Sequence, residues 1–308
     1  MVLAILAVTS LLKYDESPMF INFGRAMKEV FSVNREFIKE SKRVVIKIGT
    51  KSIMKSPTEV DYRQIDRIAY VCTSLVQDGI EVILVTSGAI GVGASLLGLE
   101  TYPKTIPDQQ AISSIGQTTL MTLYSQFFNH YNQYVGQILF TKDVIDFPES
   151  FVNMQNSLNR LLEKKIIPII NENDAVSVDE LNHKTKFGDN DTLSAYVSRT
   201  MDADLLIILS DVDGLYTENP VENPEAELID HIPEITEEVK QMASGKGSAF
   251  ATGGMATKLS AAELILDNNS HMIIANAKEP TIIRQILAGE TIGTLFGKKK
   301  NEGEIAND

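Results

Sequence analysis

The chain has 308 residues, of which 44% are hydrophobic and 22% are charged, and its formal net charge at pH 7 is -13. This length suffices for a hydrophobic core, in one large domain or two smaller ones. The negative charge argues against a nucleic-acid-binding surface, and the single cysteine, Cys72, excludes an internal disulfide and a cysteine-built metal site.

The N-terminal segment, residues 1–40, gives no readable function. Residues 1–12 are apolar, but no cationic region precedes them and no small-residue cleavage site follows, and they are too few to span a bilayer. Residues 13–40 mix basic with acidic side chains, which argues against a transit peptide. We expect an accessory segment, either a helix packed on the domain or a subunit contact, in a cytoplasmic protein without a membrane partner.

From residue 43 onward, short apolar runs alternate with helical patterns. The apolar runs predict strands covered on both faces, at residues 43–48, 80–86, 136–140, 166–170, 204–210 and 271–275. Helical periodicity predicts helices at residues 61–78, 108–129, 150–164, 191–200, 255–268 and 280–288. This alternation predicts an α/β fold with a mostly parallel central sheet sandwiched by helices, and ligands bind beyond the carboxyl ends of such strands.

Two connecting regions are also informative. Residues 216–228 carry two Asn-Pro pairs and predict an extended, turn-rich surface segment. A subdomain boundary near residue 203 fits the pattern, although no linker marks it. Cys72 lies among apolar residues of the helix predicted at 61–78, so we expect it in the core.

Lys47 is unusual because it lies inside the first apolar strand and is followed by Gly49. Burying an ammonium group is costly unless it meets an anion, and a glycine lets a phosphate approach the backbone. The alternative is a lysine that reaches solvent at a strand edge. Taken alone, that alternative is favoured.

The second strand leads into residues 86–93, TSGAIGVG, which predict a glycine-rich turn before a helix. Backbone N–H groups of such a loop can cradle an anion. The spacing matches neither the dinucleotide fingerprint nor the P-loop, so a simple tight turn is equally consistent.

Polar side chains follow the fourth strand at residues 171–174, NEND, and recur at residues 188–191, GDND. Such a cluster could hold Mg²⁺ or Ca²⁺, bind an ammonium group or orient lysines, although the spacing of a calcium loop is missing. Asp191 lies where a helix is predicted to begin, so helix capping is the structural alternative.

Two later segments suit a nucleotide. The fifth strand ends in an acidic turn at residues 210–216, SDVDGLY, and residues 252–258, TGGMATK, open a helix. Glycines before a helix expose free N–H donors, and Lys258 adds a cation one turn in, which together suit the β- and γ-phosphates.

Taken together, these motifs resemble the amino acid kinase family, over roughly residues 42–297. The matching segments occur in the family's order, as VVIKIGT (44–50), VTSGAIGVG (85–93), IPIINENDAV (167–176), KFGDNDTLSA (186–195), ILSDVDGLYT (208–217) and ATGGMATK (251–258). The INEND, GDND and TSGAI motifs favour the glutamate kinases of this family over its aspartokinases, acetylglutamate kinases, carbamate kinases and nucleoside-monophosphate kinases.

The resemblance implies roles for individual residues. Lys47 and Lys258 would stabilise the transferring phosphoryl group, and Asp191 would organise the two lysines. The implied substrate-binding positions are Ser87, Asp174 and Asn190. The implied ATP-binding positions are Lys47, Ser210, Asp211, Thr252, Gly253, Gly254, Met255, Ala256, Thr257 and Lys258.

The resemblance also implies one amino acid kinase domain at residues 41–300, with glutamate bound by about 41–203, ATP by 204–300, and a tail at 301–308. It implies Mg²⁺ carried by ATP rather than by protein ligands, feedback by proline, and a homo-oligomer, either a dimer or a tetramer. We expect no RNA-binding-like C-terminal domain of the PUA type, and no nucleic acid partner.

The expected reaction is ATP-dependent phosphorylation of the glutamate side chain to L-glutamyl 5-phosphate, the first step of proline biosynthesis. A side-chain carboxylate is already ionised at neutral pH, so this acceptor needs no general base. The alternatives are a related kinase with another acceptor, such as an acetylglutamate kinase or aspartokinase, and a non-catalytic sensor of an amino acid or nucleotide.

Overall fold

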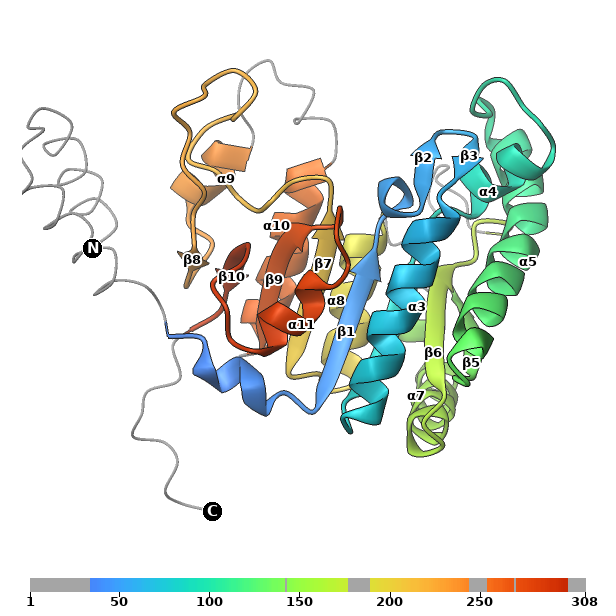
Figure 1. Ribbon diagram of the computed structural model, residues 1–308, viewed down its shortest axis with the longest axis horizontal. Coiled ribbons are helices and arrows are strands. Elements are labelled where there is room, and N and C mark those ends of the chain that lie inside the picture. Colours follow the sequence, from blue (N-terminus) through green and yellow to red (C-terminus); the bar gives the residue numbers. More distant parts are fainter. Residues whose placement is uncertain (1–33, 142, 177–188, 244–253, 269, 299–308) are drawn as a thin grey trace, which may run out of the picture. The chain divides into compact units, whose positions relative to one another are not determined.

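A computed structural model of the chain describes residues 34–141, 143–176, 189–243, 254–268 and 270–298 (Figure 1). Residues Arg35–Asp308 form one compact unit, separate from residues Met1–Asn34. The apolar N-terminal stretch and the tail at 301–308 lie outside the described residues, so the expectations for them stay untested.

All six predicted strands are present. They are β1 (Arg43–Ile48), β4 (Glu81–Thr86), β5 (Val135–Phe140), β6 (Ile167–Glu172), β7 (Leu205–Ser210) and β9 (His271–Asn276). The short strands β8 (His231–Ile232) and β10 (Thr294–Phe296) complete a sheet of order β5-β6-β4-β1-β7-β9-β10-β8. Neighbouring strands are parallel except β9 and β10, so the predicted mostly parallel sheet is confirmed.

The six predicted helices are also present. They are α3 (Tyr62–Gln77), α5 (Ile106–His130), α7 (Pro148–Glu163), α8 (Asn190–Thr200), α10 (Gly254–Leu266) and α11 (Ile282–Leu287). The periodicity did not predict the shorter helices α4 (Ala89–Leu96), α6 (Asp143–Asp146) and α9 (Glu237–Ala243), the 3-10 helices η1 (Glu36–Glu40) and η2 (Thr50–Ser52), or the hairpin of β2 (Met54–Ser56) and β3 (Glu59–Val60).

Helices cover both faces of the sheet, as Figure 1 shows with α3 and α11 in front of the strands and α8 and α10 behind them. The core behind the sheet joins alternate strand residues, such as Val45, Ile83 and Ile208, to apolar side chains of α7, α8 and α10. Successive side chains of a strand point to opposite faces, so Lys47 faces the same layer as Val45. This pleat directs the lysine toward α8 and α10.

Both ends of helix α3 carry local signals that explain why the sequence predicted this helix. Asp61 caps its first turn by accepting from the N–H groups of Arg63 and Gln64, and Gly79 follows its end with φ of +88°. Cys72 is fully buried in α3, and this burial raises the pKa of its thiol to about 12. The thiol is therefore a core group, as predicted.

The glycine-rich turn after β4 is shorter than predicted. Helix α4 begins at Ala89, so only Ser87 and Gly88 connect it to the strand. Gly88 has φ of +100°, and a Cβ there would lie 2.8 Å from Ile53 Cδ1. The prediction of a glycine loop along residues 86–93 was wrong because two of these glycines, Gly91 and Gly93, belong to α4 itself.

Outside the sheet, residues 216–228 form no regular helix or strand and are closed by a single bridge between Tyr216 and Leu228, which confirms the turn-rich segment. Within the described ranges, no helix combines the length and apolar character that crossing a membrane requires.

Candidate active site

Two lysines from distant parts of the chain meet at one carboxylate. Lys47 Nζ lies 2.6 Å from Asp191 Oδ1, and Lys258 Nζ lies 3.1 Å from Asp191 Oδ2. Both contacts are ion pairs, and Lys258 also donates a hydrogen bond to Asp191 Oδ2. All three residues are buried, with exposures of 8%, 7% and 3% for Lys47, Lys258 and Asp191. The two predicted phosphoryl-binding cations therefore converge.

Each of these side chains comes from the end of a different element. Lys47 is the second-last residue of β1, Asp191 lies in the first turn of α8, and Lys258 lies in the second turn of α10. Parallel strands bring their carboxyl ends to one edge of the sheet, and α8 and α10 begin there. The centre thus occupies the edge where the fold class places ligands.

Asp191 does not cap α8. Asp189 performs that role, because its Oδ1 accepts from the N–H groups of Asp191 at 2.7 Å and Thr192 at 2.9 Å. The carboxylate of Asp191 is therefore available to the lysines. Thr257 adds a further donor, with its hydroxyl 2.9 Å from Asp191 Oδ2.

The electrostatics of Asp191 are set by opposing effects. Burial alone would raise its pKa, but the charges of Lys47 and Lys258 outweigh burial and hold the pKa below its ordinary value. Asp191 therefore stays ionised at neutral pH. With two cations around one anion, the cluster carries a net charge of about +1, which suits an incoming phosphate.

Gly49 lies directly beside the ammonium group of Lys47. A Cβ built on Gly49 would lie 3.5 Å from Lys47 Nζ. The backbone of Gly49 is extended, with φ of -76°, so any residue could adopt it. The glycine therefore matters here for the room that it leaves next to the ammonium group.

The predicted substrate-binding residues Ser87 and Asn190 are in direct contact. Asn190 Nδ2 lies 2.7 Å from Ser87 Oγ, 2.7 Å from the carbonyl oxygen of Thr86 and 3.0 Å from Asn171 Oδ1. An amide nitrogen has two hydrogens, so these three acceptors share them. Asn190 directly precedes Asp191, which places this group beside the lysine centre.

Asp174, the third predicted substrate residue, follows β6 and lines a cavity of about 340 Å³ with residues of α5 and β5. Burial, and then the charge of Asp174, raise the pKa of the hydroxyl of Tyr102, which lies between α4 and α5.

On the nucleotide side, Ser210 ends β7 and is buried, and its hydroxyl lies 3.2 Å from Asp211 Oδ1. Asp211 also pairs with Lys51 at 2.7 Å. Burial would raise the pKa of Asp211, but Lys51 lowers it. Of the predicted ATP-binding run, Gly254 to Lys258 form the first turns of α10, whereas Thr252 and Gly253 lie outside the described residues.

Sequence reasoning missed two residues of this edge, Lys51 and Gln117, and gave Asn171 no individual role. Lys51 joins the segments after β1 and β7, Asn171 joins β6 to α8, and Gln117 on α5 accepts from Asn171 Nδ2 at 2.8 Å. Asn171 stood inside the quoted NEND motif, but no local pattern marks Lys51 or Gln117. Their partners lie 160 and 54 residues away along the chain.

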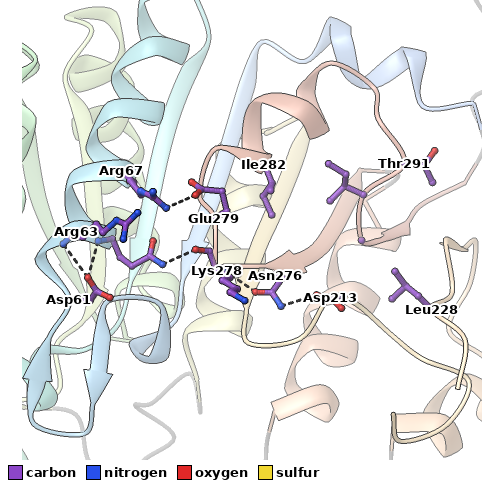
Figure 2. A pocket seen from close by; sticks show the side chains of 13 residues that line it. Asp61, Arg63, Arg67, Asp213, Leu228, Asn276, Lys278, Glu279, Ile282 and Thr291 are labelled. Atoms are coloured by element: carbon purple, nitrogen blue, oxygen red, sulfur yellow. Dashed lines mark hydrogen bonds and ion pairs between the residues drawn. The ribbon is translucent and has the colours of Figure 1, made fainter. Parts of the chain in front are cut away.

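A hollow of about 830 Å³ lies between α3, α11 and the segments after β7 and β9 (Figure 2). Its acidic side chains are engaged, because Glu279 pairs with Arg67 and Asp213 accepts from Asn276 Nδ2 at 2.8 Å. None of the predicted site residues lines it. This hollow is therefore distinct from the lysine centre.

Comparison with known proteins agrees with this geometry. The sequence model of the amino acid kinase family matches residues 42–276. A glutamate 5-kinase of Listeria monocytogenes serotype 4b (strain CLIP80459) is 53% identical over 268 residues, which cover 87% of this chain and 97% of the relative. A glutamate 5-kinase of Enterococcus faecalis is 50% identical over 270 residues, which cover 88% of this chain and all of the relative.

Solved structures share the fold at lower identity. UMP kinase from Bacillus anthracis superposes with a TM-score of 0.57 at 20% identity, covering 84% of this chain and 97% of that one. Carbamate kinase from Giardia lamblia bound to AMP-PNP gives a TM-score of 0.59 at 15% identity, covering 85% and 100%. Because the family model matches and the two glutamate 5-kinases are 50–53% identical along most of the chain, the chain belongs to the amino acid kinase family, in the branch of the glutamate 5-kinases.

Proposed function

We propose that this protein transfers the γ-phosphoryl group of ATP to the side-chain carboxylate of L-glutamate, giving L-glutamyl 5-phosphate and ADP. The observation that carries the proposal is the pair of buried lysines held at 2.6 and 3.1 Å from one aspartate at the carboxyl edge of the sheet. Relatives named glutamate 5-kinase, 50–53% identical along most of the chain, support the choice of acceptor.

The reaction requires two anions to meet. A carboxylate oxygen of glutamate attacks the γ-phosphorus, a new O–P bond forms, and the bond to the bridging oxygen breaks with its electrons leaving on ADP. The acceptor is already ionised at neutral pH, so no side chain has to remove a proton. Lys47 and Lys258 stabilise negative charge on the transferring group, and Asp191 keeps both ammonium groups in place before ATP arrives.

Mg²⁺ fits this site as a cation carried by the phosphates of ATP. Asp191 has Lys47 at one oxygen and both Lys258 and Thr257 at the other, which leaves it poorly suited as a metal ligand. In the described part of the chain, no three His, Cys, Asp or Glu side chains are grouped to share a metal ion. Bound to ATP, Mg²⁺ would neutralise phosphate charge.

For the acceptor, Ser87, Asn190 and Asp174 are the proposed binding residues. Asp174 carries a negative charge suited to the ammonium group of an amino acid, and it lines the 340 Å³ cavity. For the donor, Ser210, Asp211 and residues 252–258 are the proposed ATP contacts. We further propose residues 41–203 and 204–300 as the respective lobes.

Other properties of the proposal follow from the resemblance alone. They are a step in proline biosynthesis, feedback by proline, a homo-oligomeric state and a cytoplasmic location. None of these four properties is needed for the proposed phosphoryl transfer, which uses only the residues at the carboxyl ends of the strands.

The test is hydroxamate formation from glutamate, Mg-ATP and hydroxylamine, because hydroxylamine traps an acyl phosphate. We expect the signal with glutamate and not with aspartate, N-acetylglutamate or carbamate. Hydroxamate from another acceptor in place of glutamate would reject the proposed substrate, and ATP binding without any hydroxamate would favour a sensor.

A further inference from the structure

Gln117, on α5, ends a relay of three side-chain amides that leads to Ser87. Gln117 Oε1 accepts from Asn171 Nδ2 at 2.8 Å, and Asn171 Oδ1 accepts from Asn190 Nδ2 at 3.0 Å. Asn190 in turn donates to Ser87 Oγ at 2.7 Å. The relay therefore connects α5, β6, α8 and the turn after β4.

Backbone groups decide which way each amide of the relay points. The N–H of Glu172 donates to Asn171 Oδ1 at 2.9 Å, and the carbonyl oxygen of Thr86 accepts from Asn190 Nδ2 at 2.7 Å. A backbone N–H can only donate and a carbonyl oxygen can only accept, which settles the orientation of both asparagines. Asn171 must then present its Nδ2 to Gln117, and only the oxygen end of Gln117 can receive it.

The nitrogen end of the Gln117 amide lowers the stability of the fold. Its Nε2 is buried and has no hydrogen-bond partner among the described residues. An unpaired buried donor destabilises a fold, and methionine would fill a similar volume without one. Methionine would, however, leave Asn171 Nδ2 unpaired, so glutamine exchanges one unpaired donor for another and gains little folding stability, whereas its oxygen orients Asn171.

The location of Gln117 connects the relay to the acceptor. Gln117 lines the same 340 Å³ cavity as Asp174 and Ala89, and Ala89 begins α4 directly after the turn that carries Ser87. α5 packs tightly against α4 here, because a Cβ on Gly116 would lie 1.8 Å from the carbonyl oxygen of Ala89. The helix is thus held in a fixed position behind the relay.

We infer that Gln117 is a positioning residue for the phosphoryl acceptor, which acts through Asn171 to hold Asn190 and Ser87 in the arrangement that binds the amino acid. This inference rests on the proposed function. Asp191 is held separately by the cap of Asp189 and by the lysines, so loss of Gln117 leaves the phosphoryl centre intact.

The test compares Gln117→Met with Gln126→Met, an exposed glutamine on the same helix, in the hydroxamate assay. The substitution at 117 removes one unpaired donor and frees another on Asn171, so the thermal midpoint should stay within about 3 °C. We expect the KM for glutamate to rise more than about twofold and up to about 12-fold, the worth of one neutral hydrogen bond. kcat and the KM for ATP should change less than about twofold, and Gln126→Met should match wild type.

A double mutant tests the route through Asn171. In an Asn171→Ala background, Gln117→Met should add less than about twofold to the KM for glutamate, because the relay is already broken. Additive effects, an unchanged KM in the single mutant, or loss of the fold with Gln117→Met would each overturn the inference. Failure of wild-type protein to form glutamyl hydroxamate would instead reject the proposed function.

Discussion

Replacing Asp191 with asparagine tests the arrangement on which the site depends. The change keeps the shape of the side chain but removes the charge between Lys47 and Lys258, whose ammonium groups lie 2.6 and 3.1 Å from it. Two buried cations are then left facing each other across a neutral amide. We expect lower stability and slower phosphoryl transfer.

The magnitude follows from burial and distance. Opposite charges about 4 Å apart attract by about 4 kcal/mol at an effective dielectric constant near 20, and removing one partner of a buried pair costs about 3–5 kcal/mol. We expect Asp191→Asn to lower the free energy of unfolding by about 3–5 kcal/mol, and the thermal midpoint by roughly 10 °C. The exposed pair of Asp78 with Arg284, at 2.9 Å, supplies the control, and Asp78→Asn should cost about 0–1 kcal/mol.

The effect of Asp191→Asn should depend on pH. Burial would raise the pKa of Asp191, but the two lysines lower it below its value in the unfolded chain. A depressed carboxyl pKa contributes stability that is complete above about pH 4 and is lost as pH falls through the folded-state pKa. The stability gap between wild type and Asp191→Asn should therefore be constant from pH 5 to 8 and narrow below pH 4.

Urea unfolding at pH 7 and pH 3 measures both quantities, and the hydroxamate assay measures turnover. If Asp191→Asn stays within about 1 kcal/mol of wild type at pH 7 and keeps its turnover, Asp191 does not hold the two lysines in place. A stability gap that widens in acid would contradict the direction of the pKa shift.

Three further predictions concern single side chains. Lys47→Ala and Lys258→Ala should each lower kcat by about 10²–10³ while the KM for glutamate changes little, and near-normal turnover would remove that lysine from the mechanism. Asp174→Ala should raise the KM for glutamate at least about tenfold through loss of a charged contact, and an unchanged KM would reject its role. Arg35 is 2% exposed and donates to the carbonyl oxygens of residues 292, 230 and 293. Arg35→Met should therefore lower the free energy of unfolding, measured in urea, by about 3 kcal/mol. Lys55→Met, at an exposed ion pair, is the control and should lower it by at most about 1 kcal/mol.

The fold was predictable where burial leaves a clear pattern. The strands at 43–48 and 204–210 are covered on both faces, so their inner positions are apolar except for Lys47. A continuous apolar run of this kind is typical of a strand buried on both faces. The strands β8 and β10 have two and three residues, too few to show any period. Helix α4 was missed because its glycines resemble a loop, whereas one of them, Gly93, allows close packing against α5.

The candidate site was predictable as a set of residues but not as an arrangement. Lys47 stood out because a charged side chain in an apolar strand needs a partner, and Lys258 because it follows glycines at a helix start. Nothing local distinguished Asp191 from a helix cap. The structure decided this by giving the cap to Asp189.

By itself, the sequence determined which segments form strands and helices, and which residues carry chemistry at the strand ends, because hydrophobic periodicity and motif composition are local properties. Only the tertiary structure decided that the ammonium groups of residues 47 and 258 share the carboxylate of residue 191, and that Gln117 orients an amide network from another helix. These contacts join residues 54 to 144 positions apart. They depend on the order of strands in the sheet, which periodicity does not encode.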